Sequence, residues 1–353
     1  MLSVGGTPVS AAFWSRLIQL TVNDREGEKS DSIEMDLEDG QPHLQIPDKG
    51  DEIECSMGYE GGPFDFMGKY IVDDVDIECL PWKMKIKGKS ANMREDLKEH
   101  RERHWDNKPL KDVFGEIGRE AGLKVQVAPS IGAFSYPWLA QMNESALHFV
   151  QRIAERHNGL FSIKNGTLIV AERGAGMTAG GTDIGVLEIT PPIIIEGTCS
   201  VSFNQRERHS ETDGEYHDIG TGERKRETAK DGDKGPTYTH RHGFSSKSEA
   251  KAAARSRAKY LKREGVRTAV EIEGNPYVKA GMHMTYAGVR PQVDGIVFTI
   301  EDVTHSYSKR RGYRTSIKGK IKDGDQPSGE ATAGRTKVPA KPAAQASYPP
   351  GGV

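Results

Sequence analysis

One short pattern occurs twice in the chain, and it decides the fold class. The first copy runs through Gly68-Lys-Tyr-Ile-Val-Asp-Asp-Val75 and closes on Ile86-Lys-Gly-Lys89. The second copy runs through Gly295-Ile-Val-Phe-Thr-Ile-Glu-Asp-Val303 and closes on Ile317-Lys-Gly-Lys320. The numbering offset is 303 − 75 = 228 between the Asp-Val pairs and 319 − 88 = 231 between the closing glycines, a slip that one hairpin loop could absorb. The repeat predicts two copies of one small sheet module, so three chains could present six similar faces around an axis.

The residues around the first copy alternate between apolar and polar types. This period of two predicts short strands over 14–22, 32–37, 51–57, 70–72 and 84–86, separated by Gly, Pro and Asp clusters. Several short antiparallel strands at this spacing make a small barrel or sandwich. The repeat therefore predicts a mainly β protein with two related small antiparallel β-barrels.

Composition excludes several classes of protein. The 353 residues allow two or three domains, and 49 basic against 51 acidic residues leave no charge footprint for nucleic acid or an anionic membrane. The apolar runs are too short to span a membrane and the start lacks the basic residues of a secretory signal, so we expect a soluble protein made in the cytosol. Cys55, Cys79 and Cys199 are odd in number and widely spaced, which favours small buried hydrophobic residues over a disulfide framework or a zinc site.

The period changes from two to that of a helix at about residue 92. We expect a helix near 110–121 capped by Asn107, and a second helix that follows Ser145. An Asn165-Gly166 turn then predicts a hairpin, because this pair supplies the positive φ angles of a two-residue turn. These elements predict an inserted α+β domain over 92–184.

The C-terminal half divides into three kinds of sequence. Residues 186–206 return to strand character, and the polar stretch 204–242 carries mixed charge. An alanine- and arginine-rich helix at 246–264, expected to lie on a barrel with its charges outward, leads into the second copy. Residues 323–353 contain five Pro, five Gly and six Ala, too little apolar surface to order a chain, so we expect a disordered tail.

No catalytic motif for a nucleophile, a phosphate loop or a metalloprotease occurs. His240 and His242 could bind a metal, but alternate histidines in a polar loop are more often exposed to solvent. The pairs Asp73-Asp74 and Glu301-Asp302 could form a carboxylate dyad for glycan hydrolysis. Because these pairs recur at matching places in both copies, a strand-end or turn role is the better interpretation.

The run Lys98-Glu-His-Arg-Glu-Arg-His-Trp105 offers basic residues and an aromatic ring, the combination that binds single-stranded nucleic acid. Its interleaved glutamates and the balanced net charge favour a solvated or partner-facing segment instead. The sequence therefore predicts no catalytic, cofactor-binding or metal-binding residues.

Several segments, taken in order, resemble a known family. They are Ser15–Asp24, Ser30–Asp39, Ile46–Gly50, Met67–Val75, His104–Leu110, Gln141–Ser145, Phe149–Ala154, Glu273–Gly281 and Glu301–His305. This order over residues 12–322, interrupted at 205–242, is similar to the late control D family, the tail baseplate hub proteins of contractile-tailed phages of the Mu and P2 types and of pyocins.

The resemblance implies a non-enzymatic structural protein that assembles as a homotrimer in the host cytoplasm and becomes part of the virion. Its two barrels per chain would form a pseudo-sixfold ring under the tail tube protein, with a trimeric spike protein on the opposite face and other baseplate proteins around it. No cofactor, membrane or sequence-specific nucleic acid is implied. The chain lacks the β-helical spike of the longer type VI secretion relatives after residue 322, so the spike is expected to be a separate protein.

The domain boundaries that follow are a first barrel from 1–91 with about 185–204, the insert at 92–184, and a second barrel at 205–322. Two alternatives stay open. One is a peptidoglycan hydrolase of the tail tip, which a muralytic assay would separate from a structural hub. The other is the spike core of a type VI secretion system, which predicts a longer β-helical C-terminus.

Deletion of residues 324–353 should leave the melting temperature and the number of subunits unchanged, because this tail has no apolar periodicity with which to pack. Differential scanning calorimetry and light scattering on the full and truncated chains check this. A drop of several degrees, or loss of assembly, would mean that the tail packs on the body.

Overall fold

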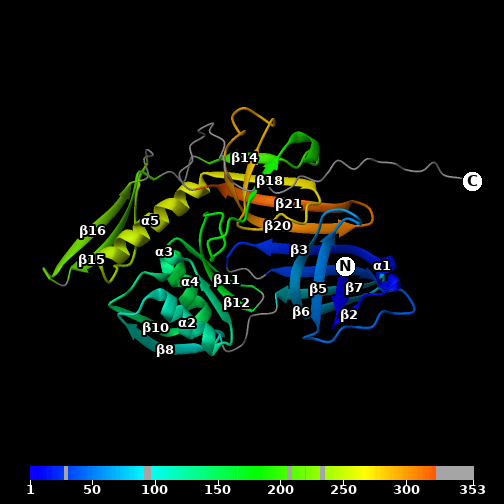
Figure 1. The fold of residues 1–353 in the computed structure, drawn as a ribbon, viewed down its shortest axis with the longest axis horizontal. Coiled ribbons are helices and arrows are strands. Elements are labelled where there is room, and N and C mark those ends of the chain that lie inside the picture. Colours follow the sequence, from blue (N-terminus) through cyan, green and yellow to red (C-terminus); the bar gives the residue numbers. More distant parts are fainter. Residues whose placement is uncertain are drawn as a thin grey trace, which may run out of the picture.

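The computed structural model describes residues 1–27, 31–90, 97–164, 166–204, 209–218, 220–230 and 235–322, and the tail that was expected to be disordered lies outside them. The fold is mainly β (Figure 1). None of the helices in the described segments is long and apolar enough to cross a membrane. The elements are β1 Leu2–Val4, β2 Thr7–Pro8, α1 Ala11–Arg16, β3 Leu17–Arg25, β4 Ser32–Glu38, β5 Glu52–Gly58, β6 Phe64–Cys79, β7 Trp82–Ser90, β8 His100–Asp106, α2 Leu110–Glu120, β9 Lys124–Val127, α3 Pro129–Gly132, β10 Trp138–Ser145, α4 Ala146–Arg156, β11 Gly159–Lys164, β12 Thr167–Glu172, β13 Val186–Ile189, the 3-10 helix η2 Pro191–Ile193, β14 Ser200–Phe203, β15 Glu211–Asp218, β16 Glu223–Lys230, β17 Thr237–Thr239, α5 Lys247–Glu264, β18 Val266–Glu273, β19 His283–Tyr286, β20 Phe298–Ser308 and β21 Gly312–Ile321.

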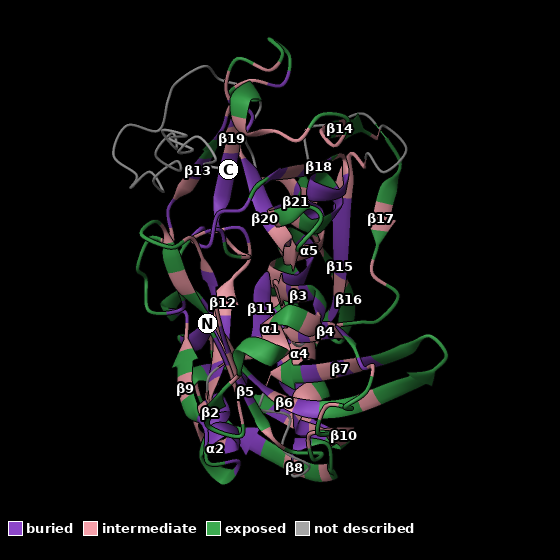
Figure 2. Ribbon diagram, turned by 90° about the vertical axis from the view of Figure 1, so that its right-hand side faces the viewer, coloured by how far each residue is buried: buried purple, intermediate pink, exposed green. Residues whose placement is uncertain are grey.

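One long sheet joins the two ends of the chain. Its strand order is β14-β18-β21-β20-β3-β4-β7-β6-β5-β1-β2, with β19 and β13 branching from β20. The blue N-terminal strands and the orange C-terminal strands of Figure 1 therefore belong to one continuous sheet. The two groups of strands join where β20 pairs with β3. Separate hydrophobic clusters fill the two halves, one built on β1 to β7 and one on β13 and β18 to β21 (Figure 2, where buried residues are purple). We call these halves the N-module and the C-module.

The repeat seen in the sequence is a repeat of three strands. β5, β6 and β7 pair in that order, as do β19, β20 and β21. Each copy has a β-bulge at the same place: Asp73 is the extra residue opposite β7, and Glu301 is the extra residue opposite β21. The offset between them is 301 − 73 = 228, the same as that between the Asp-Val pairs.

The three-residue slip between the copies lies in their hairpins. From the first paired residue after the bulge to its partner, the N-module hairpin runs from Asp74 to Lys87 and the C-module hairpin from Asp302 to Lys318. The differences in numbering are 87 − 74 = 13 and 318 − 302 = 16, so the C-module hairpin is the longer one. One extra residue is in its loop and one is on each arm, so the loop alone does not absorb the slip.

The glycine of each Lys-Gly-Lys closure faces the bulge of the neighbouring strand. A Cβ atom on Gly88 would lie 3.2 Å from the carbonyl oxygen of Ile71 and 2.9 Å from a methyl group of Ile33. A Cβ atom on Gly319 would lie 2.8 Å from the carbonyl oxygen of Thr299. Ile71 and Thr299 are separated by the same offset, 299 − 71 = 228, so the same close approach of backbone requires glycine in both copies.

Residues 185–204 belong to the C-module, which differs from the expected assignment to the first barrel. β13 runs parallel to β19, and β14 pairs antiparallel with β18. Leu187 and Ile189 are buried in the C-module cluster. The chain therefore returns from the middle segment directly to the edge of the C-terminal sheet.

The middle segment has a hydrophobic core of its own. Helices α2 and α4 cover the sheet β11-β12-β9, and the two-stranded antiparallel sheet of β8 and β10 lies beside them, at the lower left of Figure 1. Both predicted helices are confirmed, and Ser145 caps α4 by accepting a hydrogen bond from the N–H of His148. Asn107 does not cap α2, because its φ of 49° places it in a left-handed turn and Pro109 occupies the cap position. The expected hairpin forms, although Asn165 lies outside the described residues.

Two further stretches have structure that the sequence did not predict. Residues 14–16 are the end of the short helix α1, whose cap is Ser10, and not the start of a strand. Within the polar stretch 204–242, strands β15, β16 and β17 form a small sheet that packs on α5. A Cβ atom on Gly214 would lie 2.6 Å from the carbonyl oxygen of Ala250, so this sheet approaches the alanine face of the helix closely.

Replacement of Gly319 by Ala should lower the free energy of unfolding by about 1–3 kcal/mol, because the new methyl group meets a fixed carbonyl oxygen. Gly88→Ala should do the same. Urea unfolding measures both, and Gly115→Ala is the control: Gly115 lies in α2 with open space around it, so alanine should raise stability by about 0.5–1 kcal/mol there. Equal changes in the free energy of unfolding at all three sites would contradict the view that the backbone contact at the bulge requires glycine.

Candidate functional site

The repeated carboxylates lie at the two bulges, within strands rather than at strand ends or turns. The Lys89 ammonium pairs with Asp73 at 2.5 Å, and the Lys320 ammonium pairs with Glu301 at 2.9 Å. The offset between the two lysines is 320 − 89 = 231, equal to that between the closing glycines, so the ion pair repeats along with the bulge. The Lys89 side chain is 64% exposed, whereas that of Lys320 is 20% exposed because Glu264, at the end of α5, also pairs with it.

An acid for glycan hydrolysis needs a raised pKa, so that it carries a proton at neutral pH. The hydrogen bond and charge of Lys89 instead hold the pKa of Asp73 below its usual range. Asp74 pairs with Lys87 at 3.0 Å, and Asp302 lies 4.0 Å from Arg25. The carboxylates at and next to the bulges are therefore held in ion pairs with neighbouring basic side chains.

His240 is held within the small sheet on α5. Its ring packs edge-on against Tyr238 and Phe244, and its Nε2 lies 3.3 Å from the carbonyl oxygen of Ala253. Burial lowers the pKa of His240. No group of three or more potential metal ligands occurs among the described residues, and His242 lies exposed in the loop.

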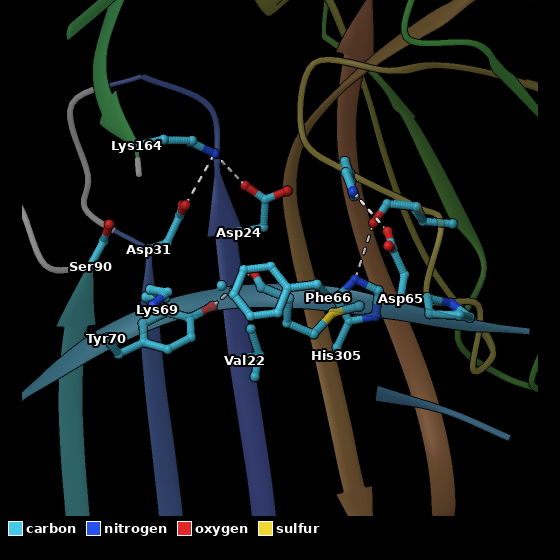
Figure 3. Close-up of a pocket in the computed structure, with 15 residues that line it drawn as sticks. Val22, Asp24, Asp31, Asp65, Phe66, Lys69, Tyr70, Ser90, Lys164 and His305 are labelled. Atoms are coloured by element: carbon cyan, nitrogen blue, oxygen red, sulfur yellow. Dashed lines mark hydrogen bonds and ion pairs between the residues drawn. The ribbon is translucent and has the colours of Figure 1, made fainter. Parts of the chain in front are cut away.

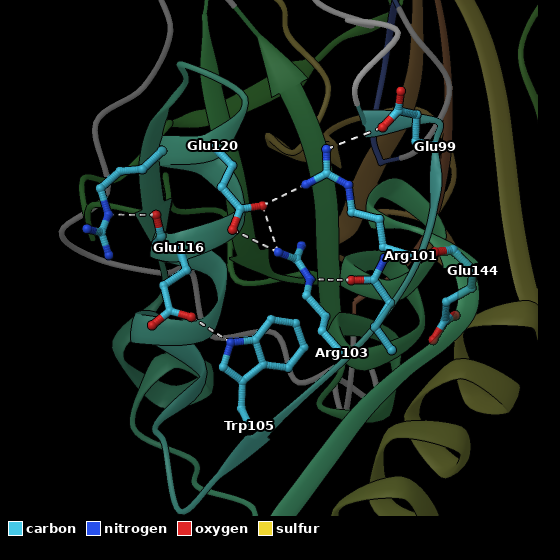
Figure 4. Close-up of polar contacts among 10 residues, drawn as sticks. Glu99, Arg101, Arg103, Trp105, Glu116, Glu120 and Glu144 are labelled. Atoms are coloured by element: carbon cyan, nitrogen blue, oxygen red, sulfur yellow. Dashed lines mark hydrogen bonds and ion pairs between the residues drawn. The ribbon is translucent and has the colours of Figure 1, made fainter.

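The basic run at 98–105 includes β8, and its charges are used inside the middle segment (Figure 4). The guanidinium groups of Arg101 and Arg103 both donate to the Glu120 carboxylate, at 3.0 and 2.7 Å. The Trp105 indole N–H donates to Glu116 at 2.6 Å, and the ring is buried. A ring in this position cannot stack on a base, so the run attaches β8 to α2.

The three cysteines have different surroundings. Cys55 is buried, and burial raises the pKa of its thiol to about 12. Cys199 is half-buried, and Cys79 is exposed at the end of β6. The prediction of a small buried hydrophobic residue is therefore confirmed for Cys55 and wrong for Cys79.

A cluster of charged side chains lies where the N-module, the middle segment and the C-module meet (Figure 3). Asp24 of β3 accepts from the Lys164 ammonium of β11 at 2.6 Å and from the N–H of Ala280, in the C-module, at 2.9 Å. Lys164 also pairs with Asp31 at 3.2 Å. One carboxylate thus contacts the middle segment and the C-module at once.

The surroundings shift the pKa values of Asp24 and Asp31 in opposite directions. Burial favours the neutral form of Asp24, but Lys164 and the Ala280 N–H together outweigh it and lower the pKa. Burial, and then the charge of Asp24, raises the pKa of Asp31 to about 6 against the attraction of Lys164. The lysine is therefore the charge that allows two carboxylates to lie together.

A cavity of about 290 Å³ adjoins this cluster and is lined on one side by Phe66, Tyr70 and His305 (Figure 3). The imidazole of His305 is fully engaged, with Nε2 on the carbonyl oxygen of Val278 at 3.1 Å and Nδ1 on the Tyr313 hydroxyl at 2.9 Å. Burial lowers the pKa of His305 to about 4, so it is neutral at pH 7. The cavity has acidic, basic and aromatic walls, but its charged groups already have partners.

Sequence reasoning missed the cluster because Asp24, Lys164 and Ala280 lie in three separate segments. Within its own segment, Asp24 is simply an acidic residue next to the end of a strand at Arg25. Surface turns commonly have the same pattern, so it did not point to a cluster. The cluster can join the three parts of the chain and set their relative orientation. Its charged groups form ion pairs with one another.

Replacement of Lys164 by Met should lower the free energy of unfolding by about 2 kcal/mol at pH 7, because two partly buried carboxylates lose their shared cation. The loss should shrink as pH falls through about 6, since a carboxyl with a raised pKa is penalised only in its charged form. Urea unfolding at pH 7 and pH 5 tests both statements.

Lys89→Met is the matched control, because it breaks an equally short but more exposed pair and should cost less than about 1 kcal/mol. If the two variants lost the same stability, or if the Lys164 variant lost more at pH 5, the cluster would not be the junction described.

A family model described as phage tail baseplate hub (GPD) matches residues 86–310. A probable baseplate hub protein of Escherichia phage P2 is 30% identical over 190 residues, which is 54% of this chain and 49% of the phage protein. The corresponding protein of Escherichia phage 186 is 27% identical over the same lengths. The chain thus spans about half the length of the curated relatives it matches.

Solved structures share the fold. A tail protein from Neisseria meningitidis superposes with a TM-score of 0.67 at 13% identity, covering 90% of this chain and 95% of that one. The 43 kDa tail protein of prophage MuSo2 from Shewanella oneidensis gives 0.64 at 13% identity, covering 90% and 96%. An Escherichia coli component of the type VI secretion system gives 0.56 at 11% identity, covering 93% and 79%.

The family match spans well over half of the chain, from β7 at the end of the N-module through β20 of the C-module. It thus includes the whole middle segment and most of the C-module, whereas the resembling segments before residue 86 lie outside it. The chain belongs to the phage tail baseplate hub (GPD) family.

Proposed function

We propose that this protein is the structural hub of a phage-like contractile tail, a homotrimer that adapts the sixfold tail tube to a trimeric spike. The duplicated strand order carries the proposal: β5-β6-β7 and β19-β20-β21 have the same pairing and the same bulge. Three chains with two such modules each make six similar units around one axis. The bulge glycines and ion pairs maintain the similarity between the modules.

The domain scheme follows with changes in the C-terminal half. The first barrel is residues 1–91, the insert is 92–184, and the second barrel is built from 185–204 together with 266–322. The small sheet β15 to β17 and helix α5 lie between these two segments in the chain and form a unit of their own. The insert occurs once per chain, so the face that it builds would keep threefold symmetry. That face is the one we assign to the spike, and the ring of modules is the one we assign to the tube protein.

The proposed mechanism is mechanical. The hub would transmit load between the tube and the spike through continuous strands, and the junction at Asp24 and Lys164 would keep the insert in a fixed orientation. Other baseplate proteins would bind its outer surface. The protein would be assembled in the host cytoplasm and carried in the virion.

Light scattering and native mass spectrometry test the proposal, with an expected mass of three chains. Purified protein should leave peptidoglycan intact in a zymogram and a dye-release assay. A stable monomer would contradict the ring. Wall-degrading activity that disappears in Asp73→Asn, Asp74→Asn, Glu301→Gln or Asp302→Asn would favour the tail-tip hydrolase instead.

A further inference from the structure

The junction between β20 and β3 reveals a second junction that the single chain leaves open. In β20, residues 298–299 pair with β19 on one edge, and residues 302–308 use that edge to pair with β3. The equivalent strand β6 pairs with β5 through residues 64–71 and with β7 through residues 70–79. Among the described residues, no strand pairs with the other edge of β6 beyond Asp73.

The C-module has a matching open edge. The N-module has the order β3-β4-β7-β6, and the C-module has the order β14-β18-β21-β20. β14 is therefore the counterpart of β3. β3 pairs with β20 of its own chain, whereas in the described part of the chain β14 has β18 as its strand neighbour and stands at the end of the sheet.

We propose that residues 74–79 of β6 pair antiparallel with residues 199–203, around β14, of a second copy of this chain. The intermolecular pair would repeat the β20·β3 pair found within the chain. The proposal rests on the hub function proposed above, because three such contacts would close three chains into a ring.

The internal repeat fixes the register. Ile33 and Thr268 each face the closing glycine of their module, and they pair with Val22 and Val201 respectively. Val22 therefore corresponds to Val201. His305 pairs with Val22 and corresponds to Ile77, since 305 − 228 = 77. Ile77 should then face Val201 of the second copy.

This register brings exposed apolar side chains together. Because the pairing is antiparallel, facing numbers sum to 77 + 201 = 278, so Val75 faces Phe203 and Cys79 faces Cys199. Ile77 is 45% exposed and Phe203 is 55% exposed in the single chain. All three pairs lie on one face of the strand, so apolar residues meet apolar residues across the contact.

The opposite face of the contact is compatible in charge. The same sum places Asp76 opposite Ser202 and Glu78 opposite Ser200. A hydroxyl can donate to a carboxylate, and no like charges face each other. A slip by one residue would place Ile77 and Cys79 opposite these serines, so the register is well specified.

Oxidation of the wild-type protein tests the pairing directly. Facing Cα atoms of an antiparallel pair are roughly 4.5–5.5 Å apart, within the span of a disulfide. Diamide accepts the two hydrogens of the Cys79 and Cys199 thiols as the S–S bond forms. Non-reducing denaturing electrophoresis should show covalent dimers and then covalent trimers, all lost on reduction.

Single-cysteine variants assign the bond. Cys79→Ser and Cys199→Ser should each abolish the linkage, and Cys55→Ser should leave it unchanged because Cys55 is buried in the N-module. A trimer by light scattering that forms no such bond would overturn the pairing and leave the hub function standing. A bond that persists in Cys199→Ser would also overturn the pairing, and a monomer would overturn both proposals.

A non-covalent test uses an exposed apolar residue elsewhere as the control. Ile77→Asp and Phe203→Asp should each reduce the measured mass from three chains to one, with unchanged far-ultraviolet circular dichroism. Trp138→Asp, at a residue of β10 that is 56% exposed, should keep three chains. Trimers that survive both edge substitutions would contradict the proposed contact.

Discussion

The antiparallel pairing of β20 with β3 is the constraint on which the rest of the structure depends. It joins residues as far apart in sequence as Asp24 and Val303, and it makes one sheet of two modules. Side chains alternate across a strand, so a register slip of one residue would turn every core residue outward. Asp24 stands in this pairing and holds Lys164 and the Ala280 N–H, which ties the insert and the C-module loop to the same strand.

The bulge is the second constraint, and it explains why the repeat remains visible in the sequence. An extra residue in one strand brings a carbonyl oxygen against its neighbour, so only glycine fits opposite it, at Gly88 and at Gly319. The following lysine then meets the extra carboxylate. The other buried positions of the two modules need mainly apolar character and suitable volume, which many residues satisfy. A close backbone contact therefore preserves a motif where packing alone would not.

The sequence predicted the elements whose signal is local. Period-two strands, the helices α2, α4 and α5, and the repeated closure all follow from neighbours a few residues apart. The strands at 211–230 were missed because their side chains are mostly charged, and only contact with the small residues of α5 makes them a sheet. The placement of 185–204 and the Asp24 cluster depend on pairings between distant segments, which no local pattern encodes.

The two modules share one strand order but differ in how their edges are used. The edge of β20 is completed by β3 of the same chain, and the equivalent edges of β6 and β14 are left unpaired by the strands that the structure describes. Unpaired edges with exposed apolar residues favour aggregation unless a defined partner covers them. The pairing of β20 with β3 within the chain fixes the angle between the two modules. The remaining edges therefore have a fixed orientation before chains associate, and less conformational entropy is lost when a partner binds. A duplicated module with one junction made and one left open is therefore suited to forming closed rings.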